Sequence, residues 1–209
     1  MKIGRRMNIN DEAIAYMEQK YGEKFEYSAP FGNSMSGTHQ LLVKCASFPN
    51  QNIVVSIENY RTKDRVFLDN YLAVKFHTEY TELFQSYASE VFGEAGEATV
   101  FCRINTMTLS PELLANATIY EYLADTSAPL VLTVKVKESD FISEEQAKRF
   151  AELIAANGSY FSISFIVVDD SEYETFDIEA LYELVGLKKY IRYAIITRLD
   201  SNGIRTEWS

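Results

Sequence analysis

The first half of the chain shows a helical spacing of apolar residues, then strand spacings, then a helical spacing again. After Asn10, apolar residues recur at intervals of three and four, which predicts a helix that ends at Gly22. Residues 25–27, 41–45 and 53–57 place apolar side chains at alternate positions, which predicts strands. The helical spacing returns over residues 71–92, and a further strand is expected over 99–104.

The second half is expected to alternate helix and strand three times. Ser110 is a predicted helix cap, and Ser143–Gln146 has the pattern of a capping box. In the first strand of this half, Thr133, Lys135 and Lys137 are expected to face solvent. The expected elements are a helix over 110–123, a strand over 130–137, a helix over 143–157, a strand over 161–167, a helix over 177–186 and a strand over 190–198.

This order of elements predicts an α+β fold with a mixed, largely antiparallel sheet or sheets and helices packed on one face. Consecutive strands in the first half are expected to be antiparallel, because their connections are too short for crossovers. The chain is expected to form a single compact unit over 1–209. Residues 105–110 are the candidate seam between subdomains 1–104 and 111–209, an arrangement that allows two similar halves.

The composition argues against nucleic-acid and membrane-spanning classes. The 209 residues include 20 Lys+Arg and 30 Asp+Glu, a formal net charge of −10. Binding to nucleic acid needs a concentrated face of Lys and Arg, so no nucleic-acid partner is expected. Apolar runs such as Phe165–Val168 are far shorter than the ~20 residues of a membrane helix, so no membrane span is expected.

Negative charge is concentrated in the second half. Residues 1–104 carry 11 basic and 13 acidic side chains, whereas residues 105–209 carry 9 basic and 17 acidic ones. No Lys or Arg occurs from Phe150 to Leu187. A solvated surface, a docking surface for a basic protein partner and cation binding all stay open for this stretch. Its spacing does not match an EF-hand loop. The candidate contact residues in it are Asp169, Asp170, Glu172 and Glu174.

A loop over residues 32–39 has the glycine spacing of a phosphate-binding P-loop. Thr38 and His39, however, stand where that motif needs Lys and then Ser or Thr. A strand rather than a helix is expected to follow, so nucleotide binding is not expected. The loop is either a flexible connection or a ligand-contacting loop that uses Ser34, Ser36 and His39.

Few side chains are available for covalent chemistry. Cys45 and Cys102 are expected to be buried thiols in a reducing compartment, although a disulfide between them stays geometrically open. Neither His39 nor His77 lies in a metal-ligand spacing. A nucleophile–base pair of His39 with Cys45, or of His77 with Cys102, stays open on residue type alone. No catalytic residue, metal site or cofactor is assigned.

Three stretches carry a resemblance to known proteins: Tyr16–Tyr27, Asp69–Phe76 and Glu90–Gly93. Together they resemble small uncharacterised proteins of Gram-positive gut bacteria, some of which are lipid-anchored outside the cell. The resemblance covers roughly the first half of the chain and implies no catalytic residues, because the group has no assigned activity. It does imply that an extracytoplasmic location stands beside a cytoplasmic one. The chain lacks the lipidation cysteine of the anchored members near its N-terminus.

The sequence therefore favours a non-enzymatic binding or interaction protein that uses an acidic surface. The alternative is a hydrolase whose site is assembled in space from histidine, cysteine and carboxylate groups, and a third reading is a structural accessory subunit. No apolar signal core follows the basic start at Lys2–Arg6. The cytoplasm is thus the default location, and an extracytoplasmic one is expected if a leader has been removed.

Overall fold

The computed structural model describes residues 8–33, 37–93, 98–106, 113–125, 129–140, 143–176, 178, 192–198 and 203–208. The chain forms two compact units. The first unit comprises Met1–Lys75 and Asn105–Thr118, and the second comprises Phe76–Ile104 and Ile119–Ser209. The division at residues 105–110 into 1–104 and 111–209 stays a prediction.

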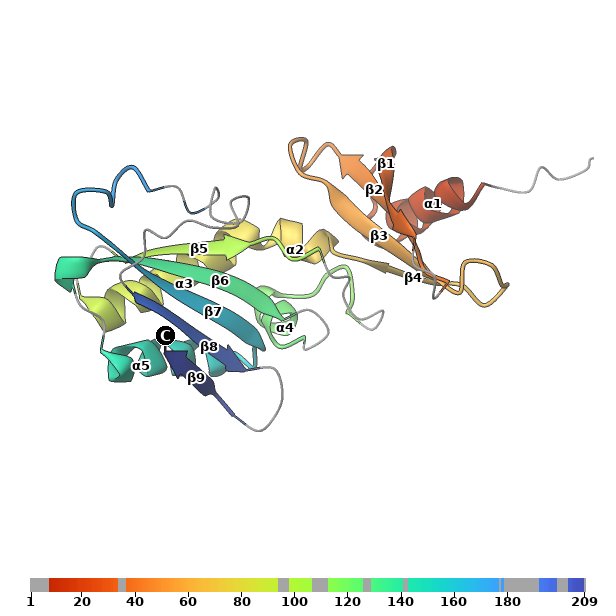
Figure 1. Ribbon diagram of the computed structural model, residues 1–209. Coiled ribbons are helices and arrows are strands. Elements are labelled where there is room, and N and C mark those ends of the chain that lie inside the picture. Colours follow the sequence, from red (N-terminus) through yellow and green to blue (C-terminus); the bar gives the residue numbers. More distant parts are fainter. Residues whose placement is uncertain are drawn as a thin grey trace, which may run out of the picture. The chain divides into compact units, whose positions relative to one another are not determined.

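The first unit contains a four-stranded antiparallel sheet in the order β1-β2-β3-β4, with helices before and after it (Figure 1). Leu41 and Val43 of the second strand are fully buried, as their alternation predicts. The third strand is buried from Ile53 to Ile57, so its place inside the sheet matches its apolar run. The elements are α1 (Ile9–Tyr21), β1 (Phe25–Asn33), β2 (His39–Cys45), β3 (Ile53–Glu58), β4 (Val66–Asp69) and α2 (Tyr71–Lys75).

The ends of α1 follow from its capping residues. Asn8, rather than the predicted Asn10, is the N-cap, and its side chain accepts a hydrogen bond from the Asn10 N–H at 3.3 Å. Gly22 ends the helix at a φ of 73°, a left-handed conformation that suits glycine. The helix is therefore slightly longer at its start than the sequence pattern predicts.

Asn70 connects three parts of the first unit. Its buried side chain accepts a hydrogen bond from the Val54 N–H at 2.7 Å and donates one to the Asn105 carbonyl at 2.8 Å. A buried amide satisfied on both sides avoids the desolvation cost of an unpaired polar group. These bonds hold Asn105 near the start of β3.

The second unit contains a five-stranded sheet in the order β5-β6-β7-β8-β9 (Figure 1). Strands β6 and β7 are parallel, and the other neighbouring strands are antiparallel. The α+β prediction with a mixed, largely antiparallel sheet is thus confirmed. The elements are α3 (His77–Phe92), β5 (Thr99–Arg103), α4 (Ile119–Leu123), β6 (Leu130–Lys137), the 3-10 helix η1 (Glu138–Asp140), α5 (Glu144–Ala155), β7 (Phe161–Val168), β8 (Arg192–Arg198) and β9 (Arg205–Trp208).

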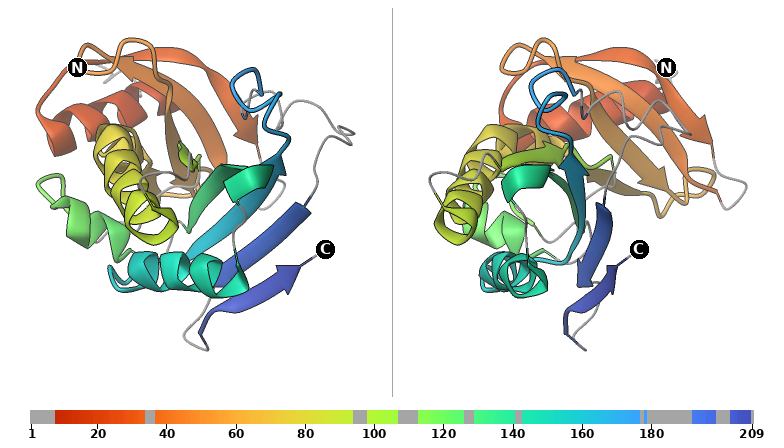
Figure 2. Two further views of the ribbon diagram at one scale, coloured as in Figure 1. Left: turned by 90° about the vertical axis from the view of Figure 1, so that its left-hand side faces the viewer. Right: turned by 60° about the vertical axis from the view of Figure 1, so that its left-hand side comes forward.

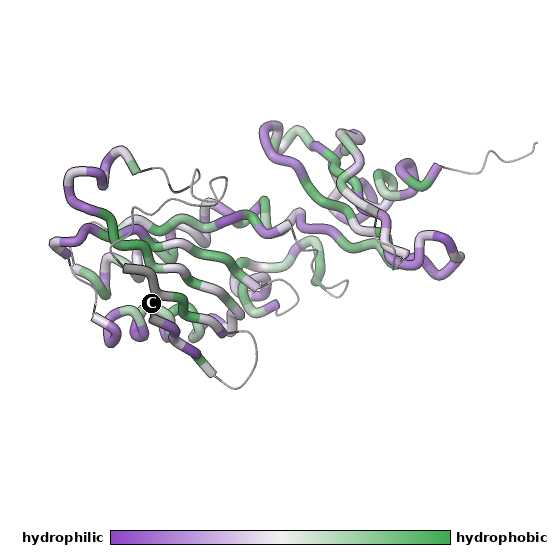
Figure 3. The backbone as a smooth tube through the Cα atoms, viewed as in Figure 1, coloured by the Kyte–Doolittle hydropathy of each residue, from purple (hydrophilic) through white to green (hydrophobic). Residues whose placement is uncertain are grey.

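Helices α3 and α5 cover one face of this sheet (Figure 2). Three aromatic rings join the layers: Phe150 of α5 lies 5.6 Å from Phe92 of α3 and 6.1 Å from Phe165 of β7, measured between centroids. The capping box predicted at Ser143–Gln146 is confirmed, because both of its hydrogen bonds are present. Figure 3 shows hydrophobic residues along β6 and β7, where this core lies.

Two helix predictions differ from the structure. The helix expected over 71–92 is interrupted at Phe76, which separates α2 from α3. The helix expected over 110–123 is described only from Ile119, because a turn in which the Ala117 N–H donates to the Leu114 carbonyl precedes it. Residues 110–112 lie outside the described residues, as does nearly all of the helix expected over 177–186.

Within the ranges that the structure describes, no helix combines the length and the apolar character needed to cross a membrane.

Helix α1 is held along β4 by three side-chain pairs, which we call the helix–strand ladder. Four residues of a helix rise about 6 Å, and two residues of a strand rise about 6.6 Å. Every fourth residue of α1 can therefore meet every second residue of β4 and its approach. The pairs are the Glu12–Arg65 ion pair, the stacked rings of Tyr16 and Phe67 at 5.3 Å between centroids, and the Lys20–Asp69 ion pair at 2.8 Å.

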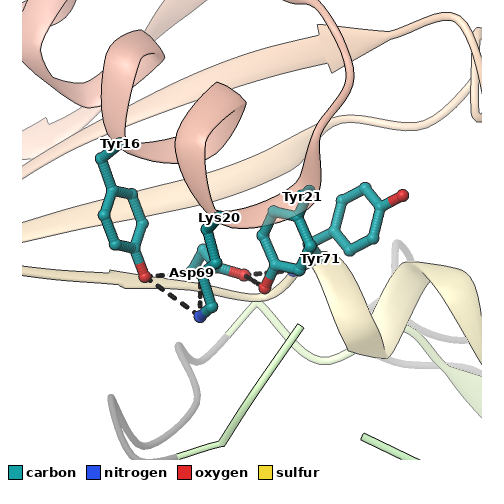
Figure 4. A network of polar contacts seen from close by, with 5 residues as sticks. All are labelled: Tyr16, Lys20, Tyr21, Asp69 and Tyr71. Atoms are coloured by element: carbon teal, nitrogen blue, oxygen red, sulfur yellow. Dashed lines mark hydrogen bonds and ion pairs between the residues drawn. The ribbon is translucent and has the colours of Figure 1, made fainter. Parts of the chain in front are cut away.

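Asp69 is the most heavily bonded residue of this ladder (Figure 4). Its Oδ2 accepts from the Tyr16 hydroxyl at 2.9 Å and from Lys20 Nζ at 2.8 Å. Its Oδ1 accepts from the Tyr21 hydroxyl at 2.6 Å and from the Tyr71 backbone N–H at 3.0 Å. The side chain of Asp69 is 0% exposed, so these four donors replace its hydration.

The two tyrosines act only as donors in this network. Burial, and then the nearby Asp69 carboxylate, raise the pKa of Tyr16 and the pKa of Tyr21 well above the ordinary phenol value. Both hydroxyls therefore keep their protons, and both hydrogen bonds to Asp69 persist across the physiological pH range.

We expect Asp69→Ala to destabilise the first unit by about 3–5 kcal/mol, because it leaves Lys20 without its partner in a site that is largely shielded from water. The free energy of unfolding is measured in urea from the amide resonances of the first unit. The matched control is Asp64→Ala, at an exposed carboxylate, for which a change within about 0.5 kcal/mol is expected. A loss below about 1 kcal/mol in Asp69→Ala would contradict the role of this network.

Candidate functional site

Six carboxylates follow the ends of two neighbouring parallel strands in the second unit. Lys137 of β6 pairs with Val168 of β7, so the chain leaves both strands at the same edge of the sheet (Figure 1). The segments that follow are η1 and residues 169–176. We call their acidic side chains the carboxylate rim: Glu138, Asp140, Asp169, Asp170, Glu172 and Glu174.

Hydrogen bonds connect and order the two segments of the rim. The Ser139 N–H donates to Asp170 Oδ1 at 3.1 Å, which joins η1 to the segment after β7. Asp169 accepts from the Ser171 N–H at 2.8 Å and from the Ser171 hydroxyl at 2.5 Å. These bonds lower the pKa of Asp169, whose exposed carboxylate is charged at neutral pH.

Tyr173 anchors the acidic segment to the sheet. It is 4% exposed and packs with Ile166 and Val168 of β7. Its hydroxyl lies 2.9 Å from the Thr99 hydroxyl of β5. An aromatic side chain that is buried inside an otherwise polar segment fixes the backbone of that segment against the sheet.

Lys135 of β6 binds the same segment from the side of the sheet. Its Nζ lies 4.3 Å from the centroid of the Tyr173 ring and donates to the carbonyls of Tyr173 at 2.8 Å and Phe176 at 3.3 Å. The prediction that Thr133, Lys135 and Lys137 face solvent is wrong for the first two, which are 0% and 9% exposed. Residues 173–176 cover Lys135, a tertiary contact that strand periodicity does not reveal.

The structure thus brings together all four acidic residues predicted from the sequence. Asp169, Asp170 and Glu174 are exposed, and Glu172 is half-buried. Sequence reasoning missed Glu138 and Asp140, which the parallel pairing of β6 and β7 places beside them. It also missed Lys135 and Tyr173. The signal that was available for Tyr173 is an aromatic residue in the middle of an acidic run.

The rim offers spread negative charge rather than a chelating pocket. Among the described residues, no group of three or more His, Cys, Asp and Glu side chains converges to hold a metal ion. Separated carboxylates at a surface attract cationic groups over distances up to the Debye length, about 8–10 Å at physiological ionic strength. The arrangement is therefore suited to electrostatic recognition.

His39 lies in the first unit, at the start of β2, whereas the rim lies in the second unit. Its ring centroid is 5.7 Å from that of Tyr60, and its Nε2 is 3.4 Å from Asn10 Oδ1. Ser34 and Ser36, the other predicted contact residues of this loop, lie outside the described residues.

The histidine–cysteine pairs considered as nucleophile and base are not assembled. His39 and Cys45 stand at opposite ends of β2, about 20 Å apart along an extended strand. His77 Nε2 lies 2.6 Å from the backbone carbonyl of Cys102, so this imidazole bonds to the main chain rather than to the thiol. The two cysteines are free thiols, without the disulfide that the sequence left open.

The thiols are in environments that suppress ionisation. Burial raises the pKa of Cys102 to about 12, against a smaller lowering by the Thr81 hydroxyl. Burial also raises the pKa of Cys45, with the Glu23 carboxylate adding to the shift. A nucleophilic cysteine needs the opposite environment, in which the thiolate is stabilised.

Comparisons with known proteins give one structural neighbour. No family model and no curated protein matches the chain. A DUF5037 family protein from Ruminococcus gnavus ATCC 29149, a Gram-positive gut bacterium, overlaps 80% of this chain and 78% of its own at 14% sequence identity and a TM-score of 0.37. At that TM-score the overlap supports neither membership of the family nor a function.

We expect Cys102 to resist iodoacetamide in the folded protein at pH 8, because a pKa of about 12 leaves about one thiol in 10,000 ionised. In urea, where the thiol pKa returns to about 8.5, alkylation should accelerate at least about 100-fold. Mass spectrometry of the Cys102 peptide measures the rate, and Cys45→Ser removes the second thiol. Rapid native alkylation would show an activated cysteine.

The raised pKa of Cys102 also predicts that the stability of the protein depends on pH. The folded pKa of Cys102 lies above the unfolded value, so the unfolded chain releases this proton first as the pH rises. The Cys102 contribution to stability is therefore complete below about pH 8.5 and declines between about pH 8.5 and pH 12. Urea unfolding of Cys102→Ala should show a weaker decline over that range. An identical decline in both proteins would contradict the shift.

We expect Tyr173→Ala to release residues 169–176 from the sheet, since it removes the buried ring that anchors them. Amide hydrogen exchange at Glu172, Thr175 and Phe176, whose N–H groups bond within the segment, should accelerate at least about tenfold. Tyr120→Ala, at a side chain that is 62% exposed, is the control and should leave these rates unchanged.

Proposed function

We propose that this protein is a non-enzymatic binding protein whose carboxylate rim binds a basic segment of a protein partner. The observation that carries the proposal is the anchoring of the acidic segment by Tyr173 and Lys135. These contacts hold the backbone that carries the exposed carboxylates against the sheet. Preorganised charges bind with a smaller entropic cost than charges on a free loop.

The charge of the chain supports this choice of partner. The net charge of −10 attracts basic proteins and repels nucleic acids. Complementary charge chiefly raises the association rate and the selectivity for basic partners. Binding at the carboxylate rim requires only a basic partner. The proposal therefore applies in the cytoplasm and also outside the cell.

A binding role also agrees with the state of the reactive side chains. Cys102 is buried with a raised pKa, and the imidazole of His77 bonds to a backbone carbonyl. A hydrolase of the kind considered as the alternative needs a thiol or hydroxyl within hydrogen-bond reach of a base. The Cys45 thiol does lie within hydrogen-bond reach of the Glu23 carboxylate, but burial and this carboxylate raise the pKa of the thiol, which disfavours the nucleophilic thiolate.

We expect a fluorescein-labelled arginine-rich peptide to bind the protein with an affinity that falls at least about tenfold between about 50 and 300 mM NaCl. Asp170→Asn/Glu172→Gln/Glu174→Gln should weaken the low-salt affinity by about tenfold or more, because it removes three charges from the rim. Fluorescence anisotropy measures both effects. Asp169 is left intact to preserve its turn with Ser171.

The control has the same change in net charge elsewhere in the second unit. Glu79→Gln/Glu82→Gln/Glu152→Gln neutralises three exposed carboxylates on α3 and α5. It should change the affinity less than about threefold. Equal weakening in the two triple variants would show that net charge, not the rim, attracts the peptide. Binding that is insensitive to salt would contradict the proposal altogether.

A further inference from the structure

A pocket of about 330 Å³ lies at one end of the helix–strand ladder in the first unit. Its lining combines two cations, one carboxylate, a hydroxyl-bearing side chain and an aromatic ring. The volume is at the lower end of the range for small-molecule sites, about 300–1,000 Å³. The lining residues are Glu12, Thr62, Lys63, Arg65 and Phe67.

The wall formed by residues 59–65 is held by its own hydrogen bonds. The Thr62 N–H donates to the Asn59 carbonyl at 2.8 Å, and the Thr62 hydroxyl accepts from the Asp64 N–H at 3.1 Å. Asn59 has a φ of 53°, a left-handed conformation that asparagine tolerates well. Arg65 Nε donates to the Tyr60 carbonyl at 3.0 Å. These bonds fix the backbone of the pocket wall.

The floor of the pocket is fixed by the ladder itself. Phe67 stacks on Tyr16, and the Tyr16 hydroxyl donates to the buried Asp69. Arg65 Nη1 pairs with Glu12, and Nε is bonded to the loop, so the plane of the guanidinium is set. Neither contact engages the Nη2 donors, which a guanidinium can direct at an anion.

The two ionic pairs of the ladder are balanced in charge, but the pocket beside them also contains Lys63. Lys63 lies in the bend before β4, and four residues before Glu12 the chain has Asn8. Asn8 is neutral and caps the helix. No acidic residue occurs among residues 1–10 of the sequence. Counted over the residues that the structure describes, the lining carries one more positive than negative charge, in a protein whose net charge is −10.

We propose that this pocket binds a small organic anion. The anionic group lies between Lys63 and Nη2 of Arg65, and an apolar or aromatic body lies against Phe67. An anion restores the charge balance that Lys63 disturbs, whereas a cation would be repelled by two of the three charged lining groups. This pocket lies in a different unit from the carboxylate rim, and its ligand carries the opposite charge to the basic partner of the rim.

The test uses benzoate as the probe. Two-dimensional amide NMR spectra of the full chain monitor its binding. Benzoate should shift the amide resonances of Thr62, Lys63, Arg65 and Phe67, with a dissociation constant of the order of 1–10 mM, as expected for a fragment of this size. Lys63→Gln should weaken binding at least about threefold. Lys44→Gln, at an exposed lysine of β2, is the matched control and should leave the affinity unchanged.

Acetate and benzyl alcohol separate the two parts of the proposed ligand. Each should bind at least about threefold more weakly than benzoate, because acetate lacks the aromatic body and benzyl alcohol lacks the charge. Acetate that binds as well as benzoate would overturn the role of Phe67, and benzyl alcohol that does so would overturn the role of Lys63 and Arg65. An absence of shifts at about 20 mM benzoate would overturn the site, as would equal affinities in Lys63→Gln and the unaltered protein.

Discussion

The first unit depends on a carboxylate that has no access to water. Asp69 ends β4, and four donors from α1 and the start of α2 replace its hydration shell. Removing the partners of a buried charge lowers the free energy of unfolding by far more than an exposed ion pair contributes to it. The position of α1 along β4 is therefore set by one residue, and the neighbouring ring stack and ion pair follow from the matched spacings of helix and strand.

The second unit uses a comparable device with the charges reversed. There a nearly buried lysine, Lys135, is satisfied by the carbonyls and the ring of the segment that covers it. Tyr173 contributes the apolar contact, and the acidic side chains around it remain in water. In both units a charged residue on a strand fixes the position of a segment that the hydrophobic pattern alone leaves undetermined. The carboxylate rim lies next to Lys135, whereas the proposed pocket lies at the end of the ladder opposite Asp69.

Much of the fold could be predicted from the sequence, because periodicity identifies elements and caps identify their ends. The apolar face of β7, with Phe161, Ile163 and Phe165 buried, appears where alternation places it, and the capping box at Ser143 is present. The contacts that residues make in the folded chain could not be predicted in this way. Alternation assigned Lys135 to solvent, since nothing in β6 reveals that residues 173–176 lie over it.

The candidate sites show the same limit. The acidic run after β7 is visible in the sequence. Its position beside η1, however, depends on the parallel pairing of β6 and β7. The pocket beside Phe67 was not predicted, because residues 12 and 65 are separated by more than half of the first unit and meet only through the ladder. Sequence reasoning could locate the acidic run but could not tell which charged residues meet in space, since pairing is a property of the fold.

The parallel pairing of β6 and β7 also determines where the chain tolerates inserted residues. Both strands run in register for eight residue pairs and then leave the sheet together. Insertions after Lys137 or Val168 would lengthen the projecting segments without shifting a single strand pair, whereas an insertion within either strand would turn its side chains to the opposite face. At this edge the length of the chain can therefore change without moving a strand pair, as long as Tyr173 and Lys135 keep their contact.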